Sequence, residues 1–213
     1  MSVRQQIREA IQRMPPGELF FPTDFRMVGS DDAIKMALSR LFTDGEIKRI
    51  AHGIYYVPQF NPLVGDLLPS LDEVAVAIAK RDQVRISPTG SYALNKLGLS
   101  TQVPTRQVYI TNGPPRTIKV GKGEIRFKST NHRKLALRGP ISSLIILALD
   151  ELGSDEVTEY MKYHIKELLL KEDPMLLEAD AKLAPAWIHD FIYKTLKEEK
   201  DKSNQHEMAD ING

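Results

Sequence analysis

The stretch SDDAIKMALSRLFTDGEIKRIAHGIYYV, residues 30–57, decides the fold of the N-terminal part of this chain. Ser30 is a preferred N-cap residue, and Asp31 and Asp32 suit the positive N-terminus of a helix. Gly45 is placed to end that helix. Apolar residues recur between these limits at helical spacing and predict one buried stripe, which consists of Ile34, Leu38, Leu41 and Phe42.

A hairpin is predicted directly after this helix, because two β-prone runs, 46–50 and 54–57, flank a turn that contains Gly53. Upstream, residues 3–14 have the apolar periodicity of a helix. Residues 22–25 begin with a proline and contain a capping residue, which predicts a second, short helix. Three helices followed by a hairpin is the element order of a winged helix-turn-helix domain.

In helix-turn-helix domains the second helix of the motif enters the major groove of DNA. Here that helix spans residues 30–45, and the face opposite its buried stripe presents four residues to base edges: Lys35, Met36, Ser39 and Arg40. Three further residues lie in or beside the hairpin, where cations can contact phosphates: Lys48, Arg49 and His52. The alternatives are a solvated helix face and a winged helix that binds protein.

The rest of the chain predicts a second domain of the α+β class. β-prone runs at 107–111, 116–120 and 125–129 are separated by turn sequences and predict a small antiparallel sheet, with helices before it and a series of helices from Pro140 onward. The expected organisation is a winged helix-turn-helix domain over 1–58, a proline-rich linker over 59–70, an α+β domain over 71–197 and a disordered tail over 198–213.

Charge is unevenly divided along the chain, although the formal net charge is only +1. Residues 81–140 hold 12 Lys and Arg against 2 Asp and Glu, whereas residues 141–213 hold 8 against 16. The basic middle indicates an anionic partner. Its candidate surface consists of Arg106, Arg116, Lys119, Lys122, Arg126, Lys128, Arg133 and Lys134. Two alternatives remain: the acidic segment packs on the basic one, or these cations are only solvated strand faces.

The sequence lacks the residues and motifs that several classes of function require. The chain has no cysteine, and its five histidines are scattered without metal-ligand spacing. Neither a phosphate-binding glycine loop nor a serine-nucleophile motif is present. We therefore expect no enzymatic activity, cofactor or metal. The longest apolar run, 144–149, is far shorter than the roughly 20 residues of a membrane span. Charges throughout the first 13 residues leave no signal-peptide core, so a cytoplasmic protein is expected.

Several segments in order resemble the DUF6088 proteins, relatives of the AbiEi abortive-infection antitoxins. The resemblance covers about residues 2–170. The segments that carry it are FFPTDF (20–25), ALSRL (37–41), GEI (45–47), GIYY (53–56), PTGSYALN (88–95), LGLSTQVP (97–104) and YITNG (109–113).

This resemblance implies an N-terminal winged helix-turn-helix that binds operator DNA and represses its own operon. It also implies a C-terminal domain needed to oppose a nucleotidyltransferase-fold toxin, in a type IV system without a stable toxin complex. Ser39 and Arg40 match the family's DNA-facing positions, and Lys48, Arg49 and Tyr55 match its wing region. The helices after Met175 match nothing in the family.

A second hypothesis stays open beside the antitoxin. The chain can instead be a stand-alone RNA-binding or protein-interaction adaptor with no toxin partner. A monomer on tandem half-sites and a dimer on a palindrome are both compatible with the sequence.

Overall fold

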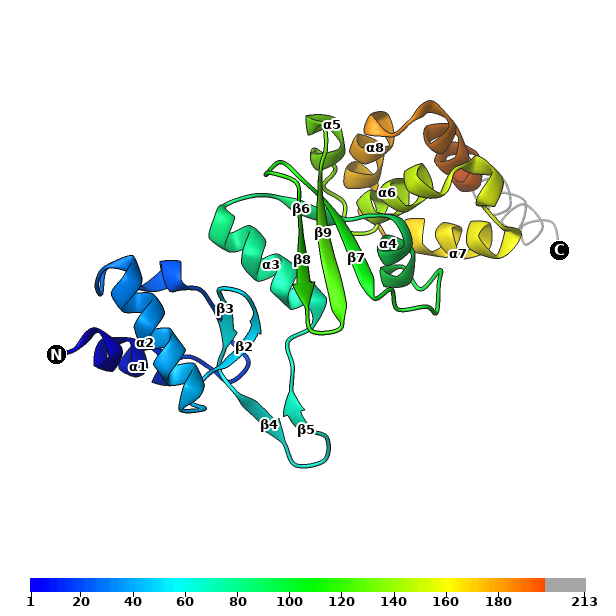
Figure 1. Ribbon diagram of the computed structural model, residues 1–213. Coiled ribbons are helices and arrows are strands. Elements are labelled where there is room, and N and C mark those ends of the chain that lie inside the picture. The colour runs from blue at the N-terminus through cyan, green and yellow to red at the C-terminus, as the bar shows by residue number, and fades with distance from the viewer. Residues whose placement is uncertain (198–213) are drawn as a thin grey trace, which may run out of the picture. The chain divides into compact units, whose positions relative to one another are not determined.

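The computed structural model describes residues 1–197, which form a mixed α+β structure (Figure 1). The helices are α1 (Val3–Gln12), the 3-10 helix η1 (Pro22–Phe25), α2 (Asp31–Thr43), α3 (Leu71–Asp82), α4 (Gly90–Lys96), α5 (His132–Leu135), α6 (Ser142–Leu152), the 3-10 helix η2 (Ser154–Glu156), α7 (Glu159–Leu169) and α8 (Pro174–Leu183). A further helical stretch is described over residues 186–197. The predicted tail, 198–213, lies outside the described residues.

The strands form three small sheets, in which the pairs β1–β3, β2–β3, β4–β5 and β6–β7 are antiparallel. They are β1 (Leu19–Phe20), β2 (Lys48–Ala51), β3 (Ile54–Tyr56), β4 (Gln59–Asn61), β5 (Gly65–Leu67), β6 (Ile86–Pro88), β7 (Arg106–Thr111), β8 (Arg116–Val120) and β9 (Gly123–Ser129). The sheet orders are β1-β3-β2, β4-β5 and β6-β7-β9-β8. The three predicted runs of the second domain are thus strands, and β6 adds an edge strand that the sequence analysis did not expect.

Two groups of residues have their own dense internal contacts. Residues 1–83 group with 117–125, here called the N-terminal unit, and residues 84–116 group with the chain from 126 onward, here called the second unit. By its contacts α3, which was expected in the second domain, therefore groups with the N-terminal unit. One contact that ties α3 to this unit is made by Arg81, whose guanidinium carbon lies 4.5 Å from the ring centre of Phe21.

The core of the N-terminal unit forms where α1 and α2 bury their apolar stripes. The Ser30 hydroxyl accepts a hydrogen bond from the Ala33 N–H at 3.4 Å, as expected of an N-cap. The buried side chains of this core are Ile7, Ile11, Phe20, Phe25, Ile34, Ala37, Leu38, Leu41, Ile47 and Tyr55. Phe42 was predicted in the buried stripe and is instead 38% exposed, because it lies at the edge of the apolar face in the last turn of α2.

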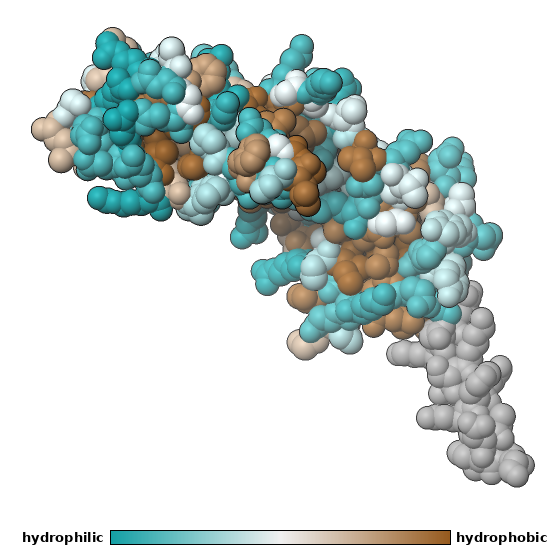
Figure 2. All heavy atoms as spheres, turned by 90° about the horizontal axis from the view of Figure 1, so that it is seen from below, coloured by the Kyte–Doolittle hydropathy of each residue, from teal (hydrophilic) through white to brown (hydrophobic). Residues whose placement is uncertain are grey.

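Residues 59–70, predicted as an irregular linker, contain a short hairpin instead. β4 pairs with β5 from Gln59↔Leu67 to Asn61↔Gly65, and Gly65 has φ +82°. The hairpin exposes Phe60, Leu63 and Val64 by 71%, 93% and 71%. Figure 2, seen from below, shows apolar surface in the region of this hairpin. The difference arises because pairing across a glycine turn satisfies backbone groups that a linker leaves to water.

The second unit has a separate core around α6. This helix is buried along most of its length, as the apolar run 144–149 predicted, and packs with α4 and α8. The buried residues of this core are Ala93, Leu94, Leu99, Ile145, Ile146, Ala148, Leu149, Ile165, Leu169, Leu177, Ala184, Ile188 and Ile192.

Two buried carboxylates hold the turn that leads into α6. Glu172 accepts hydrogen bonds from the backbone N–H groups of Ile141 and Ser142 at 2.7 and 2.8 Å. Asp180 accepts from the Gly139 N–H at 2.8 Å and from the Ser142 hydroxyl at 2.6 Å. Burial raises the pKa of Glu172, but the backbone N–H groups outweigh burial and hold this pKa below its ordinary value.

Candidate nucleic-acid interface

The face of α2 opposite the core exposes four side chains that the sequence analysis singled out. Lys35, Met36, Ser39 and Arg40 are all exposed, and they lie together because positions three and four apart share one face of a helix. Lys35 makes a long ion pair with Asp32, with 3.7 Å between Nζ and Oδ1. We call these four residues the α2 face. It offers two cations, one hydroxyl and one flexible apolar side chain to a ligand.

The β2–β3 hairpin places two more cations beside the end of α2. Lys48 is half-buried, Arg49 is exposed, and His52 is exposed in the turn that Gly53 closes with φ +69°. The guanidinium carbon of Arg49 lies 5.1 Å from the ring centre of Phe42 in the last turn of α2. The hairpin and the helix are therefore joined by a cation–π contact. Sequence reasoning missed the role of Phe42, because it assigned this ring to the core.

Tyr55 does not belong to this exposed surface, although the family resemblance placed it with the DNA-contacting residues. Its side chain is only 9% exposed and stacks on Phe20, with 6.0 Å between ring centres. All three residues of β3 are buried, so strand alternation does not bring Tyr55 to the surface. The prediction of a contact role for Tyr55 is thus corrected to a role in the core.

Two arginines of α1 pair with carboxylates at and just after the end of α2. Arg4 pairs with Asp44, and Arg8 pairs with Glu46, with its Nε donating to Oε2 at 2.6 Å. The hydrogen bond and charge of Arg8 hold the pKa of Glu46 below its ordinary value. These pairs neutralise the acidic groups at the end of α2. The charges of Arg40, Lys48 and Arg49 consequently face fewer uncompensated carboxylates.

The eight cations of the basic middle do not share one surface. Arg126 and Lys128 alternate to the side of β9 opposite the buried Phe127, as the sequence predicted. Arg116 instead lies on the Phe127 side, with its guanidinium carbon 5.3 Å from that ring centre. Arg106, Lys119 and Lys122 are exposed.

Three of these cations contact the C-terminal helices. Lys128 Nζ lies 2.9 Å from Glu151 Oε1, and Lys134 pairs with Asp150, both carboxylates belonging to α6. The Arg133 guanidinium donates to the carbonyl oxygen of Lys182 in the last turn of α8 and to that of Ala184 just after it, each at 3.4 Å. These contacts correspond to the alternative in which acidic C-terminal residues pack on the basic segment. Within residues 1–197, the exposed cations Lys119, Lys122 and Arg126 make no such contact.

Two features are absent from residues 1–197. In this part of the chain no three His, Asp or Glu side chains gather in a way that could hold a metal ion. Among the same residues, none of the helices has both the length and the apolar composition that crossing a membrane requires.

Comparison with known families gives a match. The sequence model of DUF6088, described as a family of unknown function, matches residues 6–177, which is most of the chain. No curated protein matches the chain.

Proposed function

We propose that this chain, which belongs to the DUF6088 family, is a transcriptional regulator that binds operator DNA through residues 1–58. In this proposal it acts as a binding protein and not as an enzyme. The observation that carries the proposal is the exposed α2 face beside the cationic β2–β3 hairpin.

The N-terminal elements support a winged helix-turn-helix. α1, η1 and α2 come first, and the β2–β3 hairpin follows directly, with β1 as the third strand of its sheet. In this interpretation α2 is the recognition helix and the hairpin is the wing. The four side chains of the α2 face are the residues that would reach base edges.

The residue types favour base contacts by α2 and phosphate contacts by the β2–β3 hairpin. Arg40 has the planar fork that pairs with a guanine edge, whereas Ser39 can donate to or accept from either base pair. Lys48, Arg49 and His52 are suited to phosphates on the flanking backbone. Asp31 and Asp32 lie at the N-terminus of α2, exposed, where phosphates would be repelled. We therefore place the base contacts in the middle and last turns of α2.

Few phosphate contacts imply a modest dependence on salt. Two or three neutralised phosphates give a slope of log K against log salt of roughly −2 to −3. Sequence-specific contacts must then supply a large share of the affinity.

The test is fluorescence anisotropy of the purified full chain on DNA from upstream of its own gene, against scrambled DNA of the same length, across a salt series. We expect selective binding that is lost in the double variant Lys35→Ala/Arg40→Ala. The matched control is Lys182→Ala, which removes an exposed cation from α8 in the second unit and should leave DNA affinity unchanged.

Equal affinity for both DNAs would overturn the proposed role of α2 as a specific reader. So would selective binding that the double variant retains. Circular dichroism of each variant keeps a loss of binding distinct from a loss of folding.

We also propose that residues 71–197 form the effector part of an antitoxin, joined to the DNA-binding part through residues 59–70. The resemblance to AbiEi antitoxins supports this step, and the expected antagonist is a nucleotidyltransferase-fold toxin that is opposed without a stable complex. The test is co-expression with a nucleotidyltransferase-like neighbouring gene. Rescue of growth by residues 1–213, and by the Lys35→Ala/Arg40→Ala variant, would support it, whereas continued toxicity would contradict it.

A further inference from the structure

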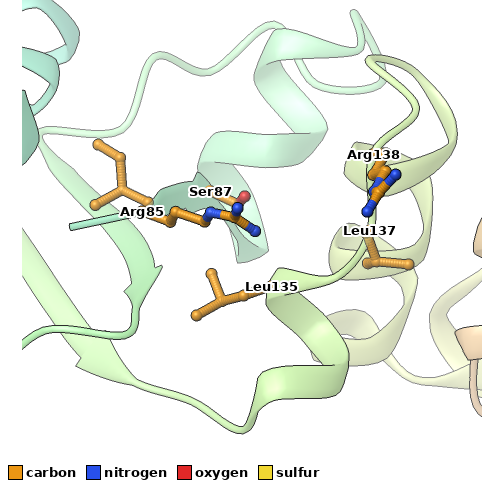
Figure 3. A pocket seen from close by; sticks show the side chains of 6 residues that line it. Arg85, Ser87, Leu135, Leu137 and Arg138 are labelled. Atoms are coloured by element: carbon orange, nitrogen blue, oxygen red, sulfur yellow. The ribbon is translucent and has the colours of Figure 1, made fainter. Parts of the chain in front are cut away.

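A groove of about 420 Å³ in the second unit is independent of the surfaces described above (Figure 3). It lies along the edge strand β6 and faces the loop after α5. Its lining is Arg85, Ile86, Ser87, Leu135, Leu137 and Arg138. The sequence analysis did not single out Arg85 or Ser87 as a binding pair, because their partners lie about 50 residues further along the chain.

The backbone on the β6 side of the groove is held in place. The Arg85 N–H donates to Asn112 Oδ1 at 2.8 Å, and β6 pairs with β7 from Ile86↔Thr111 to Pro88↔Tyr109. These bonds fix the position from which the Arg85 side chain leaves the strand.

The opposite side is anchored by buried Asp180. Its carboxylate accepts from the backbone N–H of Arg138 and of Gly139, each at 2.8 Å. Leu135 lies at the end of α5, whose N-cap Asn131 accepts from the Lys134 N–H at 3.1 Å. Both walls are thus preorganised at the level of the backbone, which reduces the entropy lost on binding.

The two guanidinium groups carry the argument for an anion. Figure 3 shows Arg85 and Arg138 on either side of the groove, with the Arg85 side chain extending toward its interior beside Ser87. No acidic residue lines the groove, and within residues 1–197 no ion pair of either arginine is found. Lys128 and Lys134 nearby do pair with carboxylates of α6. The groove therefore brings together two guanidinium groups that make no ion pair within the described chain.

We propose that this groove binds a nucleoside phosphate. The Arg85 and Arg138 guanidinium groups would clamp the phosphate through charge-assisted hydrogen bonds, and the Ser87 hydroxyl would donate a further one. Leu135 and Leu137 supply an apolar surface for the base or sugar. The volume is larger than phosphate alone requires and lies in the range of pockets for small organic ligands.

The same chemistry is available from two sources, a free nucleotide and the phosphorylated end of an RNA strand. This proposal does not rest on DNA binding by α2, so each can fail without the other. Isothermal titration calorimetry of the full chain distinguishes the sources with ATP, AMP, inorganic phosphate, adenosine, and a short RNA with or without a terminal phosphate.

We expect ATP, AMP or the phosphorylated RNA to bind, with adenosine and unphosphorylated RNA at least tenfold weaker. Arg85→Ala and Arg138→Ala should each lower the affinity at least tenfold. The matched control is Arg126→Ala, which removes an exposed cation from β9 of the same sheet and should leave the affinity unchanged. The milder variants Arg85→Lys and Arg138→Lys keep the charge and test the need for the planar fork.

Three results would overturn the proposal. One is no binding of any phosphorylated probe at millimolar concentration. Another is binding that Arg85→Ala and Arg138→Ala leave intact while thermal unfolding shows both variants folded. The third is equal affinity for inorganic phosphate and AMP, since the apolar wall would then contribute nothing.

Discussion

The guanidinium carbon of Arg49 lies 5.1 Å from the centre of the Phe42 ring, which joins the β2–β3 hairpin to the last turn of α2. The contact fixes a cation of the hairpin relative to the exposed side of the helix. Two elements that carry the candidate DNA contacts are thereby held as one surface.

The first prediction concerns this contact. Phe42→Ala frees Arg49, so a double-mutant cycle with Arg49→Ala should give a coupling of about 0.5–1 kcal/mol in the free energy of unfolding. Chemical denaturation of the four proteins measures it. Phe42→Tyr is the control, because it keeps an aromatic face and should preserve the coupling. A coupling near zero would mean that the contact contributes nothing to the surface.

The second prediction separates base contacts from phosphate contacts. Arg40→Ala should cost roughly 1–3 kcal/mol on operator DNA and reduce the discrimination against scrambled DNA. Lys48→Ala should weaken binding about equally on both DNAs and make the salt slope shallower by about 1. Anisotropy titrations at several salt concentrations distinguish the two patterns. If Arg40→Ala lowers the affinity for both DNAs equally, Arg40 does not read bases.

Local signals in the sequence predicted much of this fold. The cap at Ser30, the stripe of α2 and the glycine turn at Gly53 each depend on neighbouring residues, and each corresponds to an element in the structure. The four residues of the α2 face were also found exposed, since helical spacing alone decides which side faces the core.

Features that depend on distant residues were not predicted. Phe42 lies on the edge of the apolar stripe, and only the position of Arg49 shows that its ring is used at the surface. Tyr55 is buried because β1 and β2 flank β3 and the rings of the core reach it. The groove at Arg85 and Arg138 combines segments whose proximity no local pattern reveals.

A third prediction follows from the burial of Tyr55. Tyr55→Ala should lower the free energy of unfolding by about 3–5 kcal/mol, as large-to-small changes of buried aromatic residues do. Tyr55→Phe keeps the ring stacked on Phe20 and should change both stability and DNA affinity little. Urea denaturation and anisotropy measure the two effects. Strong loss of DNA affinity in a stable Tyr55→Phe variant would show that the Tyr55 hydroxyl contacts DNA after all.

The fourth prediction concerns the turn before α6. A Cβ at Gly139 would collide with the Ser142 hydroxyl and lie 2.6 Å from Glu172 Oε2. Gly139→Ala should therefore destabilise the chain by roughly 1–3 kcal/mol or more through overpacking. The comparison is Gly98→Ala, where φ is +71° and nothing lies within 4 Å of the added carbon. In that variant only the left-handed backbone conformation should lower the free energy of unfolding, by roughly 1–2 kcal/mol. Equal effects would show that the turn relaxes around the new methyl group.

The fifth prediction is a dependence on pH. Because the folded pKa of Glu172 is depressed, its contribution to stability is present above the ordinary glutamate pKa of about 4.3 and declines as the pH falls below it. Glu172→Gln should reduce stability at pH 7 by about 1–3 kcal/mol and weaken the acid dependence. Urea titrations from pH 7 to pH 3 measure both. Glu167→Gln, on the exposed side of α7, is the control and should match the wild type.

The ion pairs of α1 have a consequence for any variant in which its two arginines, Arg4 and Arg8, are replaced. Without Arg4 and Arg8, Asp44 and Glu46 would stand uncompensated at the end of α2, beside Arg40. A polyanion approaching this surface would then meet two bare carboxylates. Affinity would fall by long-range repulsion although every contacting side chain were still present, and the deficit would shrink as added salt screens it.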